Sequence, residues 1–121
     1  MFRLLVIGAA ALLGAAAFAF AQDKEPDEDC DGSTAQMVAC ANKKIAYWDK
    51  RLNAAYQKLM RDTTGKQQEQ LRAAQRLWVQ YRHANCLYYD LGEGTIARIE
   101  AADCMLTMTR ARTNELESNP R

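Results

Sequence analysis

The sequence has 121 residues, which is enough for one small domain and too few for several. Its 16 Lys and Arg residues nearly balance its 15 Asp and Glu residues, so its charge does not favour a nucleic-acid partner. A single histidine and four cysteines without the close pairs typical of zinc sites disfavour a metal centre. We therefore expect no cofactor.

Residues 1–21 have the three parts of a secretory signal peptide. Arg3 gives a basic start, an apolar run extends from Leu4 to Phe20, and Ala19-Phe20-Ala21 is a small-residue exit that suits a signal peptidase. The alternative is an uncleaved membrane anchor, because the run is close to the ~20 residues that span a bilayer. Its many alanines and the charged stretch behind it favour cleavage after Ala21. We therefore expect an exported protein without a stable membrane anchor.

An acidic stretch follows at residues 22–32. Apart from Lys24, its charged residues are all acidic: Asp23, Glu25, Asp27, Glu28, Asp29 and Asp31. Such a segment is typical of a solvated, flexible arm, and a specific contact with a basic partner is the alternative.

The chain then becomes helical. Ser33 and Gln36 have the spacing of a capping box, and the pattern predicts a helix from about Thr34 to Asp62. Its apolar stripe consists of Val38, Ala41, Ile45, Trp48, Leu52, Ala55 and Leu59. Thr63-Thr64-Gly65 ends this helix.

A second helix begins after Thr64, which with Gln67 offers a second capping box. Its predicted inward stripe is Leu71, Ala74, Trp78, Tyr81 and Tyr88, widened by Leu77 and Ala84. The glycines of Leu91-Gly92-Glu93-Gly94 end it. Thr95 is the predicted cap of a third helix, whose inward residues are Ile96, Ile99, Ala102, Leu106, Thr109 and Leu116.

These elements predict an all-α domain over residues 33–118, with a frayed end at 119–121, because no strand pattern of useful length is present. We expect a small three-helix bundle in which the first two helices form a long antiparallel hairpin and the third packs across it.

Two disulfides are expected in the oxidising compartment that export implies. In the predicted hairpin, Cys40 and Cys86 lie at nearly the same height on either side of the bend at Thr64. This height match favours the pairs Cys40–Cys86 and Cys30–Cys104 over the pairing of Cys86 with Cys104.

The second helix carries the pattern Gln75-x-x-Trp78-x-x-Tyr81-Arg82-x-x-x-Cys86. This run resembles the signature of the LprI-type lysozyme inhibitor family of exported bacterial proteins. Further matching positions are Cys40, Asp49, Leu52, Asn53, Tyr56, Cys104 and Arg110. The resemblance covers roughly residues 30–116. It implies a disulfide-stabilised helical domain in the periplasm or outside the cell, and a protein partner such as lysozyme or another peptidoglycan hydrolase.

Most of these motif residues also have structural explanations. Trp78 suits a core anchor, and Arg82 is expected to pair with Asp49 or Asp103 across the helices. Asn53 and Gln75 lie near the predicted helix interface and suit buried amides. His83 beside the inward face suits an ordinary, partly exposed histidine.

Catalysis is disfavoured, because the lone histidine has no serine or free thiol obviously available as a nucleophile once the cysteines pair. The chain therefore suits a non-enzymatic binding protein. Aromatic and acidic residues next to the glycine turn form the candidate partner contact: Tyr88, Tyr89, Asp90 and Glu93. Two alternatives remain: a non-inhibitory interaction module of the cell envelope, and a stapled scaffold of the mitochondrial intermembrane space, whose Cys-x9-Cys spacing only Cys30 and Cys40 share.

Overall fold

The computed structural model describes residues 24–27 and 29–119, so the predicted signal peptide lies outside the described residues. Those residues form three α-helices: α1 (Thr34–Asp62), α2 (Gly65–Asp90) and α3 (Ile96–Glu117). The prediction of an all-α three-helix bundle with two disulfides is confirmed.

The start of α1 is the predicted capping box. The Ser33 hydroxyl accepts a hydrogen bond from the backbone N–H of Gln36 at 3.3 Å, and the Gln36 side chain accepts one from the backbone N–H of Ser33 at 2.8 Å. This exchange satisfies two amides that the first helical turn leaves free.

The other two predicted caps are wrong, because neither Thr64 nor Thr95 makes a side-chain cap hydrogen bond. At the bend between α1 and α2, Gln68 takes a different role. Its side-chain amide donates to the carbonyl oxygens of Met60 at 2.8 Å and of Thr63 at 3.2 Å. Gln68 therefore ties the first turn of α2 to the last turn of α1.

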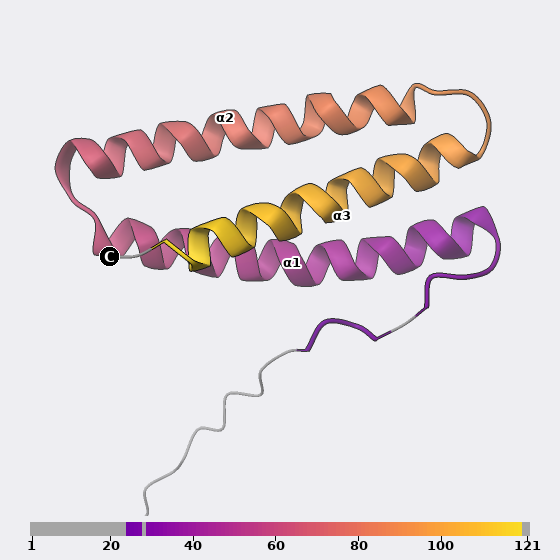
Figure 1. Ribbon diagram of the computed structural model, residues 1–121, viewed down its shortest axis with the longest axis horizontal. Helices are drawn as coiled ribbons and strands as arrows, with labels where there is room; N and C mark the ends of the chain where they lie inside the picture. The colour runs from indigo at the N-terminus through magenta and orange to yellow at the C-terminus, as the bar shows by residue number, and fades with distance from the viewer. Residues whose placement is uncertain (1–23, 28, 120–121) are drawn as a thin grey trace, which may run out of the picture.

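Helix α3 lies between α1 and α2 (Figure 1) and packs against both of them, whereas α1 and α2 contact each other little. The two long helices are antiparallel as expected, and α3 runs in the same direction as α1. Small side chains allow the close approach of α3 to α1: Thr109 and Thr113 are fully buried, and the Thr113 hydroxyl donates to the backbone carbonyl of Trp48 at 3.4 Å.

The apolar core lies where α1 meets the end of α3. Leu52, Leu59 and Leu116 are each at most 5% exposed, and the partly buried Tyr56 and Trp78 pack against this cluster. All seven residues of the stripe predicted for α1 are buried or half-buried. Sequence periodicity therefore identifies the inward face of α1 correctly.

The inward face of α2 was predicted correctly only at Leu71 and Trp78, which are half-buried and pack against the core. Tyr81 and Tyr88 are 61% and 76% exposed, and Ala74, Leu77 and Ala84 are exposed as well. Besides Leu71 and Trp78, the inward side of α2 carries Gln75, Arg82 and Cys86. Gln75 and Arg82 can be buried on this side because α1 and α3 supply hydrogen-bond partners for them. The periodicity of apolar residues alone does not reveal such partners. In α3 the prediction is correct for Ala102, Leu106, Thr109 and Leu116, while Ile96 is exposed.

The disulfide pairing was also predicted incorrectly. The bonds are Cys30–Cys40 and Cys86–Cys104, with Cα–Cα distances of 5.4 and 5.5 Å. The predicted Cys40–Cys86 bond requires α1 and α2 to pack face to face, but α3 separates them. Each bond instead closes a local loop, one joining the arm to α1 and the other joining α2 to α3.

Peptide mapping of the oxidised, unreduced protein tests this pairing. Trypsin cleaves after Arg and Lys, so residues 25–43 should form one peptide that holds the Cys30–Cys40 bond internally. Peptides 83–98 and 99–110 should stay joined through Cys86–Cys104 and separate on reduction. Recovery of peptide 25–43 bonded to peptide 83–98 would contradict the fold.

Candidate protein-binding surface

Arg82 is the most deeply placed charge in the bundle. Its side chain is 9% exposed and donates to the carboxylate of Asp49 on α1 at 2.9 Å and to the hydroxyl of Thr109 on α3 at 2.9 Å. The guanidinium also lies 4.9 Å from the ring centre of Trp78, a cation–π contact. One side chain of α2 therefore contacts both other helices, and of the two predicted partners Asp49 is the one it meets.

A second arginine cluster surrounds Trp48 of α1. The guanidinium groups of Arg51 and Arg110 lie 4.9 and 5.3 Å from the centre of its ring. Arg110 also donates to the carboxylate of Glu25 at 2.7 Å. The acidic arm is therefore attached to the bundle by this ion pair and by the Cys30–Cys40 bond, two contacts that the interpretation as a solvated arm does not include.

These contacts lower the pKa of Glu25. Partial burial opposes its ionisation, but the neighbouring Trp48 indole and Arg110 guanidinium more than offset this effect. The carboxylate is thus held in its charged form where the arm meets Arg110 of α3.

The remaining motif residues divide between the interior and the surface. Gln75 is buried, and its side-chain oxygen accepts a hydrogen bond from Arg112 at 3.0 Å. Asn53 and Tyr81 are exposed, so they are not parts of the helix interface that the sequence suggested. The buried motif residues Leu52, Gln75 and Arg82 hold the frame together and are not accessible to a partner.

The predicted contact residues Tyr88, Tyr89, Asp90 and Glu93 are all exposed at the end of the bundle where α2 turns into α3. The two tyrosine rings meet edge to face with centres 5.2 Å apart. The turn is held by hydrogen bonds from the backbone N–H of Leu91 to Leu87 and of Gly92 to Tyr89, both at 3.0 Å. We call residues 88–96 the hairpin end.

Tyr89 borders a surface hollow of about 300 Å³ that sequence reasoning did not identify. Its lining includes Glu100 and Asp103, two exposed carboxylates one turn apart on α3. Asp103 also borders a neighbouring hollow of about 320 Å³, which it shares with Cys30 of the arm. The i, i+3 spacing of these acids was the available signal, but its interpretation requires knowing which face of α3 is exposed.

A larger apolar groove of about 500 Å³ lies on the other side of α2. All three helices contribute to it, with Val38 and Ile45 from α1, Leu87 from α2 and Met105 from α3. His83 and Arg98 supply polar groups to its lining. The basic Arg98 therefore faces this groove, and the acids Glu100 and Asp103 line the hollow beside Tyr89.

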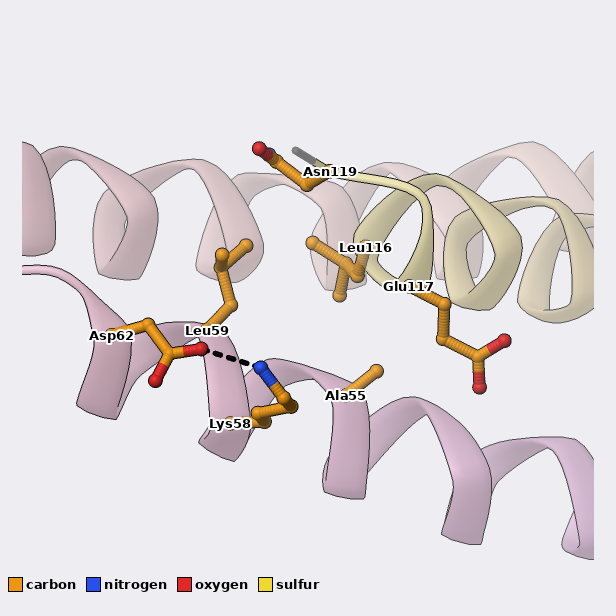
Figure 2. Close-up of a pocket in the computed structure, with 7 residues that line it drawn as sticks. All are labelled: Ala55, Lys58, Leu59, Asp62, Leu116, Glu117 and Asn119. Atoms are coloured by element: carbon orange, nitrogen blue, oxygen red, sulfur yellow. Dashed lines mark hydrogen bonds and ion pairs between the residues drawn. The ribbon is translucent and has the colours of Figure 1, made fainter. Parts of the chain in front are cut away.

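A smaller hollow of about 200 Å³ lies at the opposite end of the bundle, between α1 and the last turn of α3. Leu59 and Leu116 point into it, and an ion pair between Lys58 and Asp62 at 2.6 Å lies at its edge (Figure 2). Glu117, which also lines it, accepts hydrogen bonds from Arg51 at 2.6 and 2.7 Å. This hollow is the open end of the core, and its charged groups are already paired.

The profile of the family described as "Lysozyme inhibitor LprI" matches residues 27–116, which is most of the chain. The protein belongs to the LprI lysozyme inhibitor family. No curated protein and no solved structure gives a significant match.

Within residues 24–27 and 29–119, no helix is long and apolar enough to cross a membrane. The same residues contain no group of three or more His, Cys, Asp or Glu side chains placed to hold a metal ion. Family members are inhibitors and not enzymes, and both pairs of cysteines are oxidised, as suits an extracytoplasmic protein.

Replacement of Asp49 tests the Arg82 contact. Asp49→Ala leaves a buried guanidinium without its carboxylate, so we expect a loss of about 1–3 kcal/mol in the free energy of unfolding, measured by urea denaturation. Asp103→Ala is the control, because Asp103 is exposed on a different face and its loss should cost less than about 0.5 kcal/mol. Equal losses for the two variants would contradict the assignment.

Replacement of Glu25 tests the docking of the arm. Because its pKa is lowered in the folded protein, the carboxylate stabilises the fold above its ordinary pKa of 4.5, and this contribution disappears as the pH falls through the lowered value. Glu25→Gln should therefore be less stable than wild type by up to about 1 kcal/mol at neutral pH. The difference should vanish in acid. A difference that stays constant with pH would refute the ion pair as its cause.

Proposed function

We propose that the protein is exported to the periplasm, where it binds a lysozyme-type peptidoglycan hydrolase and blocks its substrate cleft with the hairpin end. Family membership supports the class of target, and the predicted signal peptide and the two disulfides support the compartment. The observation that carries the proposal is the exposure of tyrosines and carboxylates at one rigid end of the bundle.

The shape of the hairpin end suits insertion into a cleft. Its backbone is short and hydrogen-bonded, and the Cys86–Cys104 bond joins α2 to α3 just behind it. A rigid element loses little conformational entropy when it binds, so more of the contact energy appears as affinity. Tyrosines are also among the residues that most often dominate protein interfaces.

The charge of this end suits a basic hydrolase. Glu93, Glu100 and Asp103 are exposed around Tyr89, and the exposed Asp29 and Asp31 flank Cys30, which shares a hollow with Asp103. Carboxylates arranged in this way attract a cationic enzyme and accelerate the encounter. We assign the centre of the contact to Tyr89 and the surrounding charge to Glu93, Glu100 and Asp103.

An inhibition assay tests this proposal. The exported, oxidised protein should slow the clearing of a bacterial cell suspension by a c-type lysozyme, and Tyr89→Ala/Glu93→Gln should weaken inhibition by about tenfold or more. Glu100→Gln/Asp103→Asn should mainly slow association and reduce its dependence on salt. Binding is measured in parallel by calorimetry.

The matched control is Val79→Ala/Glu69→Gln, which removes an exposed apolar side chain and an exposed acid from α2 away from both the hairpin end and the rest of the candidate contact. It should inhibit as well as wild type. Undiminished inhibition by a folded Tyr89→Ala/Glu93→Gln variant would exclude the hairpin end as the contact. Absence of both inhibition and binding at large molar excess would exclude this class of lysozyme as the target.

A second candidate function is a non-inhibitory interaction module of the cell envelope. The observation that favours it is the set of large apolar side chains exposed along α2, because such patches mark contact sites on soluble domains. This function predicts binding to an envelope protein without any effect on the rate of lysis.

A further inference from the structure

The side of α2 that faces away from α3 is apolar and exposed. Leu77, Tyr81, Tyr88 and Leu91 are 63%, 61%, 76% and 76% exposed, and Ala74 and Ala84 between them are exposed as well. Figure 1 shows α2 at the outside of the bundle, with α3 on its inner side. None of the described residues covers this face.

The positions of these residues are those of a helix–helix contact. Ala74, Leu77, Tyr81, Ala84, Tyr88 and Leu91 follow one another at alternating steps of three and four, the spacing of a coiled-coil seam. The seam extends for ~26 Å along the helix and contains no charged residue. We call these six residues the α2 seam.

The α2 seam is complementary to itself in size when two copies lie antiparallel. With the two-fold axis placed between Tyr81 and Ala84, each Tyr81 lies opposite Ala84 of the second copy. Leu77 then lies opposite Tyr88, and Ala74 lies opposite Leu91. A small residue therefore faces a large one in the Tyr81–Ala84 and Ala74–Leu91 pairs, while two large residues meet in the Leu77–Tyr88 pair. Pairing small residues with large ones fills a helix interface without voids.

The orientation of the helices favours the same antiparallel arrangement, because helix dipoles that run in opposite directions attract each other.

We propose that the α2 seam is a self-association surface, on which a second copy of the chain packs antiparallel to form a two-fold symmetric dimer. A single pair of helices of this length is a small interface, so the dimer should be weak, with a Kd of about 1–100 µM. This inference does not depend on the identity of the hydrolase, and it leaves Tyr89 outside the contact.

Sedimentation equilibrium of the protein, expressed from its full-length sequence, exported and oxidised, tests the proposal over concentrations around the expected Kd. Wild type should shift from monomer to dimer. Leu77→Glu/Tyr81→Glu should raise the Kd by about a hundredfold or abolish the dimer, because it buries charge at the centre of the seam. Circular dichroism should show unchanged helix content, since both side chains are exposed in the monomer.

Val79→Glu/Ile96→Glu is the matched control. It introduces the same charges at partly exposed apolar positions outside the seam, 38% and 54% exposed, and should leave the Kd unchanged.

Three results would overturn the proposal. Wild type could remain monomeric up to about 1 mM, a concentration well above the expected Kd. A dimer could form that Leu77→Glu/Tyr81→Glu does not weaken. Finally, a monomeric wild type whose hydrolase binding is lost in Leu77→Glu/Tyr81→Glu would assign the seam to the hydrolase and not to a second copy.

Discussion

The position of α2 depends on the buried guanidinium of Arg82. Helices α1 and α2 contact each other little, and Arg82 meets Asp49 of α1 and Thr109 of α3. Because a charge removed from water is costly unless it is paired, α2 is held where the Arg82 guanidinium reaches both of these partners. Such a contact contributes more to the register of the helices than to net stability, and the register decides which face of α2 is exposed.

The disulfides act locally and leave that register to Arg82. Cys30–Cys40 spans a sequence separation of 10 and fixes the arm to α1, while Cys86–Cys104 spans 18 and closes the α2–α3 hairpin. Neither bond joins α1 to α2. Both bonds involve the end of the bundle that carries the hairpin end and the arm, so they keep rigid the part of the molecule that we assign to partner binding.

Sequence reasoning succeeded where local rules decide the outcome and failed where tertiary partners do. The capping box at Ser33 and the stripe of α1 were predicted correctly, because each depends on neighbours along one helix. The inward face of α2 was predicted only at Leu71 and Trp78, because Gln75 and Arg82 are buried through partners on α3 and α1. The incorrect disulfide pairing has the same origin. Comparing the positions of Cys40 and Cys86 along the helix axes assumed that α1 and α2 pack against each other. Of the candidate site, Tyr89 and Glu93 were predicted, whereas Glu100 and Asp103 depended on the unknown exposed face of α3.

Tyr88 and Tyr89 are neighbours in sequence and lie on different faces of α2, since successive residues of a helix differ by ~100° in direction. Tyr89 borders the acidic hollow on α3, and Tyr88 belongs to the α2 seam. The two proposed contacts therefore share Tyr88 and Leu91, but they are centred on different sides of α2. In an antiparallel dimer the two hairpin ends point in opposite directions, so each copy keeps Tyr89 and the carboxylates around it for a hydrolase. If two target molecules are held on the same cell wall, such a dimer engages both, and the second binding event becomes intramolecular and raises the overall avidity.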